Sequence, residues 1–114
     1  MLNIYGLKNC DTCRKALKWL EGEGIAYVFV DVRKDGIDMS DIERWAEAIG
    51  IDSLLNKRGT TWRGLSDADK ARGEGKGAVA LMATHPALIK RPVFVRNGTV
   101  MVGFTDAVKT LTRT

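Results

Sequence analysis

Two cysteines are the residues in this chain best suited to covalent chemistry. Cys10 and Cys13 are two residues apart and are the only cysteines among 114 residues. A deprotonated cysteine is a strong nucleophile, and a second thiol one helical turn away can attack a mixed disulfide formed on the first. The pattern therefore predicts thiol–disulfide chemistry, with Cys10 as the nucleophile and Cys13 as the resolving thiol.

The flanking elements indicate why Cys10 should be the more reactive thiol. Residues 2–5 favour a short strand that Gly6 breaks. The next apolar residues have the i, i+3, i+4, i+7 spacing of one helix face: Cys13, Ala16, Leu17 and Leu20. Cys10 is then expected at the helix N-terminus, where unpaired backbone amides, the helix dipole and the charges of Arg14 and Lys15 lower the pKa of a thiol.

Other interpretations of the pair remain open at this point. Two cysteines can simply be small buried apolar residues. A structural zinc site needs four ligands, and His85 is the only histidine in the chain. Zinc would thus require carboxylates or a second chain. If the redox interpretation holds, Asn9 and Thr12 are expected to donate hydrogen bonds to the sulfur, with helix capping as an alternative role for Thr12.

Composition bounds the class of protein. The chain is 45% hydrophobic and 28% charged, which is typical of one globular domain, and no stretch approaches the length of a membrane span. It starts without a basic, apolar leader, so we expect a cytoplasmic protein, where such a cysteine pair favours catalysis over a structural disulfide. The net charge of +4 suits an anionic small substrate and is also compatible with weak nucleic-acid binding.

The remaining elements predict an α/β domain. Residues 26–32 resemble a strand covered on both faces, and with the first strand and helix they form a β-α-β unit with parallel strands. Residues 38 to 85 form a helical insertion, in which Ser40 begins a capping box and Ser66 is a second N-cap.

Strand character returns around the Asn97–Gly98 pair, which predicts a hairpin with a type I′ turn. A last helix is expected to start at Thr105 or Asp106. The order β-α-β, helical insertion, β-β-α gives a four-stranded mixed sheet within one domain spanning residues 1–114.

Four segments resemble the arsenate reductase (ArsC)-related family of thioredoxin-fold proteins. They are Cys-x-x-Cys-Arg-Lys-Ala at 10–16, Leu-Leu-Asn-Lys-Arg-Gly-Thr-Thr-Trp-Arg at 54–63, Pro-Ala-Leu-Ile-Lys-Arg-Pro-Val at 86–93 and Val-Gly-Phe at 102–104. The segment at 54–63 is most similar to the YffB-like branch, proposed to contain glutathione-dependent thiol reductases. Spx-like transcription regulators, which bind the RNA polymerase α subunit and often carry a Cys-x-x-Cys redox switch, are also similar.

The resemblance implies roles for several residues. Cys10 matches the catalytic cysteine, and Arg58 and Arg91 match two arginines of the anion pocket, a role for which guanidinium groups are suited. Pro92 matches the proline that is cis in thioredoxin folds, whereas the general frequency of about 5% cis X-Pro bonds favours trans. The third arginine of arsenate reductases has no counterpart at residues 101–104. Cys13 is a second departure, because glutaredoxin-linked arsenate reductases and many YffB-like proteins have only the first cysteine.

These observations predict a small cytoplasmic thiol reductase. Glutathione is the expected co-substrate, no bound cofactor is expected, glutaredoxin is a candidate partner, and we expect a monomer that does not contact a membrane. The alternatives are an Spx-like redox-sensing regulator that binds the RNA polymerase α subunit, and an arsenate reductase. A third alternative, nucleic-acid binding through basic loops, predicts affinity that falls steeply with salt.

Overall fold

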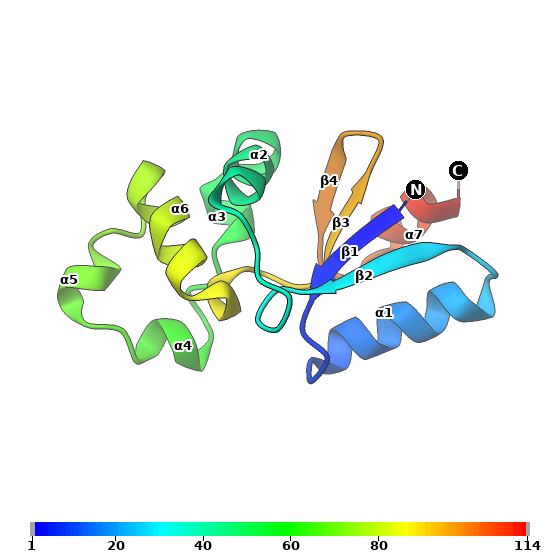
Figure 1. The fold of residues 1–114 in the computed structure, drawn as a ribbon, viewed down its shortest axis with the longest axis horizontal. Helices are drawn as coiled ribbons and strands as arrows, with labels where there is room; N and C mark the ends of the chain where they lie inside the picture. Colours follow the sequence, from blue (N-terminus) through cyan, green and yellow to red (C-terminus); the bar gives the residue numbers. More distant parts are fainter. Residues whose placement is uncertain (1, 114) are drawn as a thin grey trace. The chain divides into compact units, whose positions relative to one another are not determined.

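The computed structural model describes residues 2–113, which form strands and helices joined by loops (Figure 1). In chain order the elements are β1 (Leu2–Gly6), α1 (Asp11–Gly22), β2 (Tyr27–Asp31), α2 (Met39–Ile49), α3 (Ile51–Leu54), α4 (Thr60–Arg63), α5 (Asp67–Lys70), α6 (Gly75–Thr84), the 3-10 helix η1 (Pro86–Leu88), β3 (Val93–Arg96), β4 (Thr99–Val102) and α7 (Asp106–Arg113). They form two compact units. The sheet unit contains the described residues up to Asp35 and from Arg91 onward, and the helical unit is Gly36–Lys90.

A four-stranded mixed sheet forms the centre of the sheet unit, with the strand order β2-β1-β3-β4. β1 and β2 are parallel, while β1–β3 and β3–β4 are antiparallel pairs. Parallel neighbours need a crossover, and α1 supplies it, running alongside β2 in Figure 1. The mixed four-stranded sheet predicted from the sequence is confirmed.

The core of the sheet unit lies between one face of the sheet and two helices. The buried side chains of this cluster come from β1, α1, β3 and α7: Leu2, Ile4, Ala16, Leu20, Phe94 and Val108. The apolar spacing in the sequence thus predicted correctly which face of α1 is buried. Cys13 lies on that buried face. This packing fixes the start of α1 against the end of β1.

Two expectations about the strands were wrong. Gly6 does not break β1 but is its last, buried residue. β2 is not covered on both faces, because it is an edge strand and Val28 is 46% exposed. β-Branched and aromatic residues favour a strand by local conformation, and this preference does not depend on burial of both faces.

The hairpin and the last helix follow local sequence signals. Asn97 and Gly98 both have positive φ, 50° and 81°, as a type I′ turn requires, and Arg96 pairs with Thr99 across it. At the start of α7 the Oγ1 of Thr105 accepts a hydrogen bond from the Val108 amide at 3.3 Å, so Thr105 is the capping residue. The predicted hairpin is confirmed.

The helical unit has a core of its own, to which α2, α3, α6 and η1 contribute. Its largest buried side chains include Ile42, Leu54, Leu81, Met82, Leu88 and Ile89. The Ser66 cap is confirmed, because its Oγ accepts a hydrogen bond from the Asp69 amide at 3.1 Å. The capping box at Ser40 was wrong: the N-cap of α2 lies two residues earlier, at Asp38, and the helix begins at Met39. None of the described helices is long and apolar enough to cross a membrane.

Candidate active site around Cys10

Cys10 occupies the N-cap position of α1, with extended backbone angles of φ −92° and ψ 121°. Its backbone oxygen accepts the first helical hydrogen bond, from the Arg14 amide at 3.0 Å, and its own amide donates to the Leu7 oxygen at 3.2 Å. The sulfur therefore lies at the positive end of α1, where backbone amides lack helical partners. The helix N-terminus predicted for Cys10 is confirmed.

The surroundings of Cys10 favour its thiolate. Burial by itself raises the pKa of this half-buried thiol, but hydrogen bonds from the Cys13 amide, the Arg91 guanidinium and the Cys13 thiol outweigh burial, and the charge of Arg91 adds to them. The net result is a pKa of Cys10 below its ordinary value. A thiolate available near neutral pH is what a cysteine nucleophile needs.

Cys13 has the opposite character. It is 1% exposed and packs against the end of β1, where a Cβ added to Gly6 would lie 2.5 Å from the Cys13 sulfur. Burial, together with the neighbouring Cys10, raises the pKa of Cys13 to about 12 despite a hydrogen bond from the Leu7 amide. The two sulfurs are not joined by a disulfide in this structure. The pair therefore combines one activated thiolate with one protonated, shielded thiol.

Arg91 and Pro92 stand directly before β3 in the sheet unit. The Arg91 guanidinium donates a hydrogen bond to the Cys10 sulfur and brings a positive charge to it. The Arg91–Pro92 peptide bond is cis, which the family resemblance implied and the general frequency of such bonds did not. The Pro92 oxygen accepts a hydrogen bond from the Gly103 amide at 2.9 Å, which joins this segment to the end of β4.

Asn9 and Thr12 are both exposed. Asn9 lines a small cavity of about 120 Å³ with Lys8, Asp31 and neighbouring residues. The groups that shift the pKa of Cys10 are Cys13 and Arg91. Hydrogen bonds from Asn9 and Thr12 to the sulfur therefore stay a prediction.

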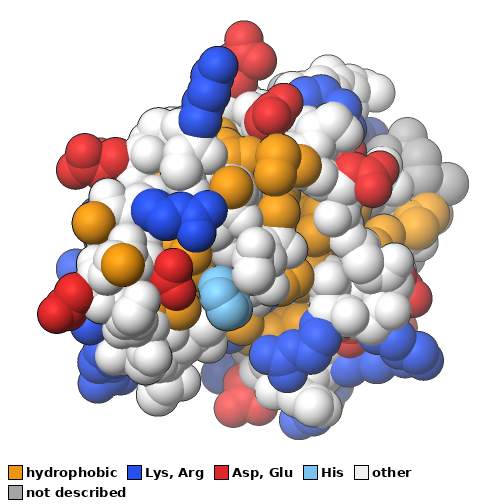
Figure 2. Space-filling view, turned by 60° about the vertical axis from the view of Figure 1, so that its left-hand side comes forward, with side chains coloured by type: hydrophobic (Ala, Val, Ile, Leu, Met, Phe, Trp, Pro, Cys, Tyr) orange, Lys and Arg blue, Asp and Glu red, His pale blue; other side chains and the backbone are white. Residues whose placement is uncertain are grey.

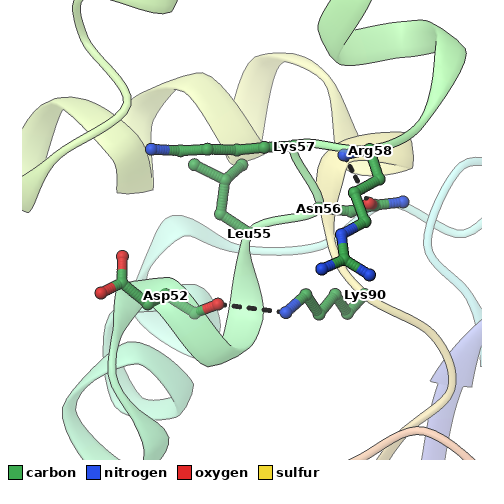
Figure 3. A pocket seen from close by; sticks show the side chains of 6 residues that line it. All are labelled: Asp52, Leu55, Asn56, Lys57, Arg58 and Lys90. Carbon is green, nitrogen blue, oxygen red and sulfur yellow. Dashed lines mark hydrogen bonds between the residues drawn. The ribbon is translucent and has the colours of Figure 1, made fainter.

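Arg58 belongs to the helical unit, where it lines an open pocket of about 370 Å³ (Figure 3). The other lining residues are Asp52, Leu55, Asn56, Lys57 and Lys90. The Arg58 amide donates to the Asn56 side-chain oxygen at 3.0 Å, and the Lys90 ammonium donates to the Asp52 backbone oxygen at 3.1 Å. In Figure 3 the Asp52 carboxylate points away from Arg58 and Lys90. Three cationic side chains thus line a pocket suited to an anion.

Sequence reasoning missed two residues that contact the candidate site. Gly6 was taken only as a strand end, although its missing side chain makes room for the Cys13 sulfur. Asp31 was not singled out, although a lone carboxylate in the otherwise apolar 26–32 run was a visible signal. Among the described residues, no group of three or more His, Cys, Asp or Glu side chains is placed to hold a metal ion.

Comparisons with known proteins cover nearly the whole chain. The ArsC family model matches residues 5–109. A solved structure of a protein named YFFB is 38% identical, with a TM-score of 0.91 and 98% of each chain covered. The solution structure of an arsenate reductase (ArsC) related protein from Brucella melitensis is 41% identical, with a TM-score of 0.76 over 96% of this chain and 92% of the other.

A protein named as a transcriptional regulator is also similar in sequence. The global transcriptional regulator Spx of Staphylococcus aureus is 23% identical over 109 residues, which is 93% of this chain and 82% of Spx. The relatives therefore include proteins named for arsenate reduction and a protein named for regulation.

Proposed function

This chain belongs to the ArsC family and has a thioredoxin-like fold, and from that membership and the surroundings of Cys10 we propose that it is a glutathione-dependent thiol reductase. The observation that carries the proposal is that the pKa values of the Cys10 and Cys13 thiols, one helical turn apart, are shifted in opposite directions. The pKa of Cys10 is lowered, while that of Cys13 is raised to about 12. One sulfur is thus prepared to attack, and the other is kept protonated until it is needed.

The proposed reaction begins with a disulfide or a glutathione adduct as substrate. The Cys10 thiolate attacks one sulfur of the substrate disulfide, the S–S bond breaks, and the leaving thiolate takes up a proton from solvent. Cys10 is then joined to the substrate in a mixed disulfide. The substrate sulfur that leaves has been reduced to a thiol, and Cys10 has been oxidised to the level of a disulfide.

Resolution of this mixed disulfide follows one of two routes. Once Cys10 is covalently bonded, it no longer carries the negative charge that helps to raise the pKa of Cys13. Cys13 then loses its proton and attacks the Cys10 sulfur, which forms a Cys10–Cys13 disulfide and releases the substrate thiolate. Two glutathione molecules reduce that disulfide and leave as oxidised glutathione. Alternatively, glutathione attacks the mixed disulfide directly, and glutaredoxin is a candidate partner for removing glutathione from Cys10.

The cationic groups are assigned to binding. Arg91 stabilises the Cys10 thiolate, and the hydrogen bond between them supports this role. Glutathione is an anionic tripeptide with two carboxylates, and the pocket lined by Lys57, Arg58 and Lys90 offers charges that complement it. Arg58 enters the proposal through its match to the family's anion-binding arginine.

Arsenate reduction is not proposed. Where the family has its third arginine, this chain has Met101–Phe104. The first two of these residues end β4, and the last two follow it. The aromatic residue of this segment, Phe104, packs on Trp19 with ring centroids 5.8 Å apart. An apolar packing role replaces a guanidinium that would otherwise contact an oxyanion.

A reductase assay with two serine variants tests the proposal. With a glutathione adduct as substrate, Cys10→Ser is expected to lower turnover by about a thousandfold or more, because the nucleophile is lost. Cys13→Ser is expected to retain a substantial rate when glutathione is present, because external thiol can resolve the adduct. Full activity in Cys10→Ser would rule out this mechanism. Equal loss in both variants would assign resolution to Cys13 alone.

A second candidate function follows from the relation to Spx together with the Cys-x-x-Cys pair. On this proposal a Cys10–Cys13 disulfide changes contact with the RNA polymerase α subunit. Binding of the purified α subunit by the reduced and the oxidised protein would test it. Redox-sensitive binding without reductase turnover would favour regulation, and no binding in either form would remove the candidate.

Nucleic-acid binding has less support. Figure 2 shows Asp and Glu side chains among the Lys and Arg side chains that are in view. Binding of a phosphate backbone is driven by an excess of Lys and Arg, and the net charge of +4 is a small excess.

A further inference from the structure

A buried carboxylate lies at the end of β2. Asp31 is only 7% exposed, although it is charged. It is the register partner of Gly6 in the parallel β1–β2 pair, so its side chain lies on the same face of the sheet as Gly6, the face against which Cys13 packs. A charged group in this place needs an explanation, because burial of an unpaired charge is costly.

The two oxygens of Asp31 have different tasks. Oδ1 accepts hydrogen bonds from the Arg33 and Lys34 amides, both at 3.0 Å, and thereby closes the turn that follows β2. Oδ2 accepts a hydrogen bond from the Lys8 amide at 3.3 Å, across 23 residues of chain. The second contact reaches the loop that connects β1 to Cys10.

That loop, residues 7–9, is held by several further contacts. The Leu7 amide donates to the Cys13 sulfur, and the Leu7 oxygen accepts from the Cys10 amide. The Lys8 oxygen accepts from the Arg14 Nε at 2.9 Å. All of these contacts stay within the β1–α1 segment, whereas the Asp31 contact ties the loop to the neighbouring strand.

We propose that Asp31 is a positioning residue for Cys10, acting by holding the 7–9 loop so that the sulfur stays against the Arg91 guanidinium and the Cys13 amide. The inference rests on the proposed role of Cys10 as the nucleophile. Hydrogen bonds from the Lys34, Lys8 and Arg33 amides outweigh burial and lower the pKa of Asp31, so it is a carboxylate throughout the neutral range. Asp31 does not touch the substrate in this proposal, and its effect is exerted through the loop.

Two variants remove the same hydrogen bond from opposite ends. In Asp31→Asn, the amide oxygen can replace Oδ1, while the NH2 group faces the Lys8 amide, so only the contact to the loop is lost. Lys8→Pro removes the donor and leaves the carboxylate in place. The matched controls are Asp35→Asn and Lys8→Ala. Asp35→Asn removes a neighbouring negative charge, while its amide oxygen can still accept the hydrogen bond that the Asp31 amide donates to Asp35 at 3.0 Å. Lys8→Ala removes the same side chain as Lys8→Pro but keeps the backbone amide.

The readout is the pH dependence of Cys10 alkylation by iodoacetamide, followed by mass spectrometry of the Cys10 peptide. We expect the midpoint to rise by about one pKa unit in both test variants, so that the rate at pH values well below the wild-type midpoint falls about tenfold. The sign is informative. Loss of a negative charge alone would lower the midpoint or leave it unchanged, because a nearby carboxylate disfavours a thiolate. Both controls should keep the wild-type midpoint.

The groups that lower the pKa of Cys10, the Arg91 guanidinium and the amide and thiol of Cys13, are unaltered in all four variants. Circular dichroism identifies the variants that fold, and if Asp31→Asn does not fold, Lys8→Pro decides alone. An unchanged midpoint in a folded test variant, even with lower thermal stability, would make Asp31 merely structural and overturn the proposal. Turnover plays no part in the readout. The result therefore stands even if Cys10→Ser shows that the proposed reductase function is wrong.

Discussion

The sheet unit and the helical unit hold their polar groups in different ways. In the sheet unit, the Cys10 sulfur, the Cys13 sulfur and the Asp31 carboxylate all accept hydrogen bonds from backbone amides. In the helical unit, Lys57 and Arg58 are exposed side chains at the rim of an open pocket. The first arrangement relies on backbone amides that fix the polar atoms, and the second relies on long side chains that are exposed to solvent.

This difference matches the two tasks of the proposed function. A reacting sulfur needs a fixed position and a low local dielectric, in which one guanidinium has a large effect on its pKa. A ligand carboxylate can be bound by exposed cations, each of which contributes little because water and salt screen its charge. The effects of substitutions should therefore differ in size between the two units.

The largest effect is expected from Arg91→Met. Burial raises the pKa of Cys10, and the hydrogen bond and charge of Arg91 lower it. Without them the pKa of Cys10 is expected to rise. We expect the pKa of Cys10 to rise by about one unit, and hence alkylation to be about tenfold slower at pH values well below the wild-type midpoint. Arg91→Lys keeps the charge and should lie between wild type and Arg91→Met. An unchanged midpoint in Arg91→Met would mean that the guanidinium does not control the thiolate.

Gly6→Ala tests how tightly the sheet unit is packed. The new Cβ would lie 2.5 Å from the Cys13 sulfur, so the sulfur or the strand must move. We expect a loss of about 1–3 kcal/mol in the free energy of unfolding, measured by urea denaturation. In a Cys13→Ala background the loss should shrink, because the sulfur is gone. Equal losses in both backgrounds would show that the clash is elsewhere.

The smallest effect is expected from the pocket of the helical unit. In Lys57→Gln and Lys90→Gln we expect the KM for glutathione to rise about twofold to fivefold with little change in kcat, as loss of one exposed charge pair implies. The change should diminish at high salt. Lys76→Gln, an exposed lysine of the same unit outside the pocket, is the control. If kcat falls with KM unchanged, these lysines act in the chemistry and the contrast between the units fails.

Local sequence signals located most of the fold. The helix face of Cys13, the Ser66 cap and the Asn97–Gly98 turn each follow from a few neighbouring residues, and each is present. The helix N-terminus at Cys10 was likewise visible in the sequence. Two of the errors concern Val28, whose exposure depends on the position of β2 at the sheet edge, and Gly6, whose role depends on a sulfur seven residues further along the chain. The third, the capping box at Ser40, misplaced the N-cap of α2 by two residues.

The chemistry of the site was less accessible from sequence. That Asp31 reaches the Lys8 amide depends on the register of two parallel strands, which no local pattern specifies. The cis bond at Pro92 was implied by the family resemblance and not by the residues themselves. The features of the site that could not be predicted from the sequence therefore depend on contacts between segments that are distant in the sequence.

The thiolate held by Arg91 and the Cys13 amide also affects the balance between the reduced and oxidised forms of the protein. Each unit by which the pKa of Cys10 is lowered stabilises the reduced form, at pH values above that pKa, by about 1.4 kcal/mol. For a two-electron couple this equals a reduction potential about 30 mV higher. The lowered pKa of Cys10 therefore makes a disulfide between Cys10 and Cys13 easier to reduce, and a weaker permanent cross-link, than it would be with an unperturbed thiol.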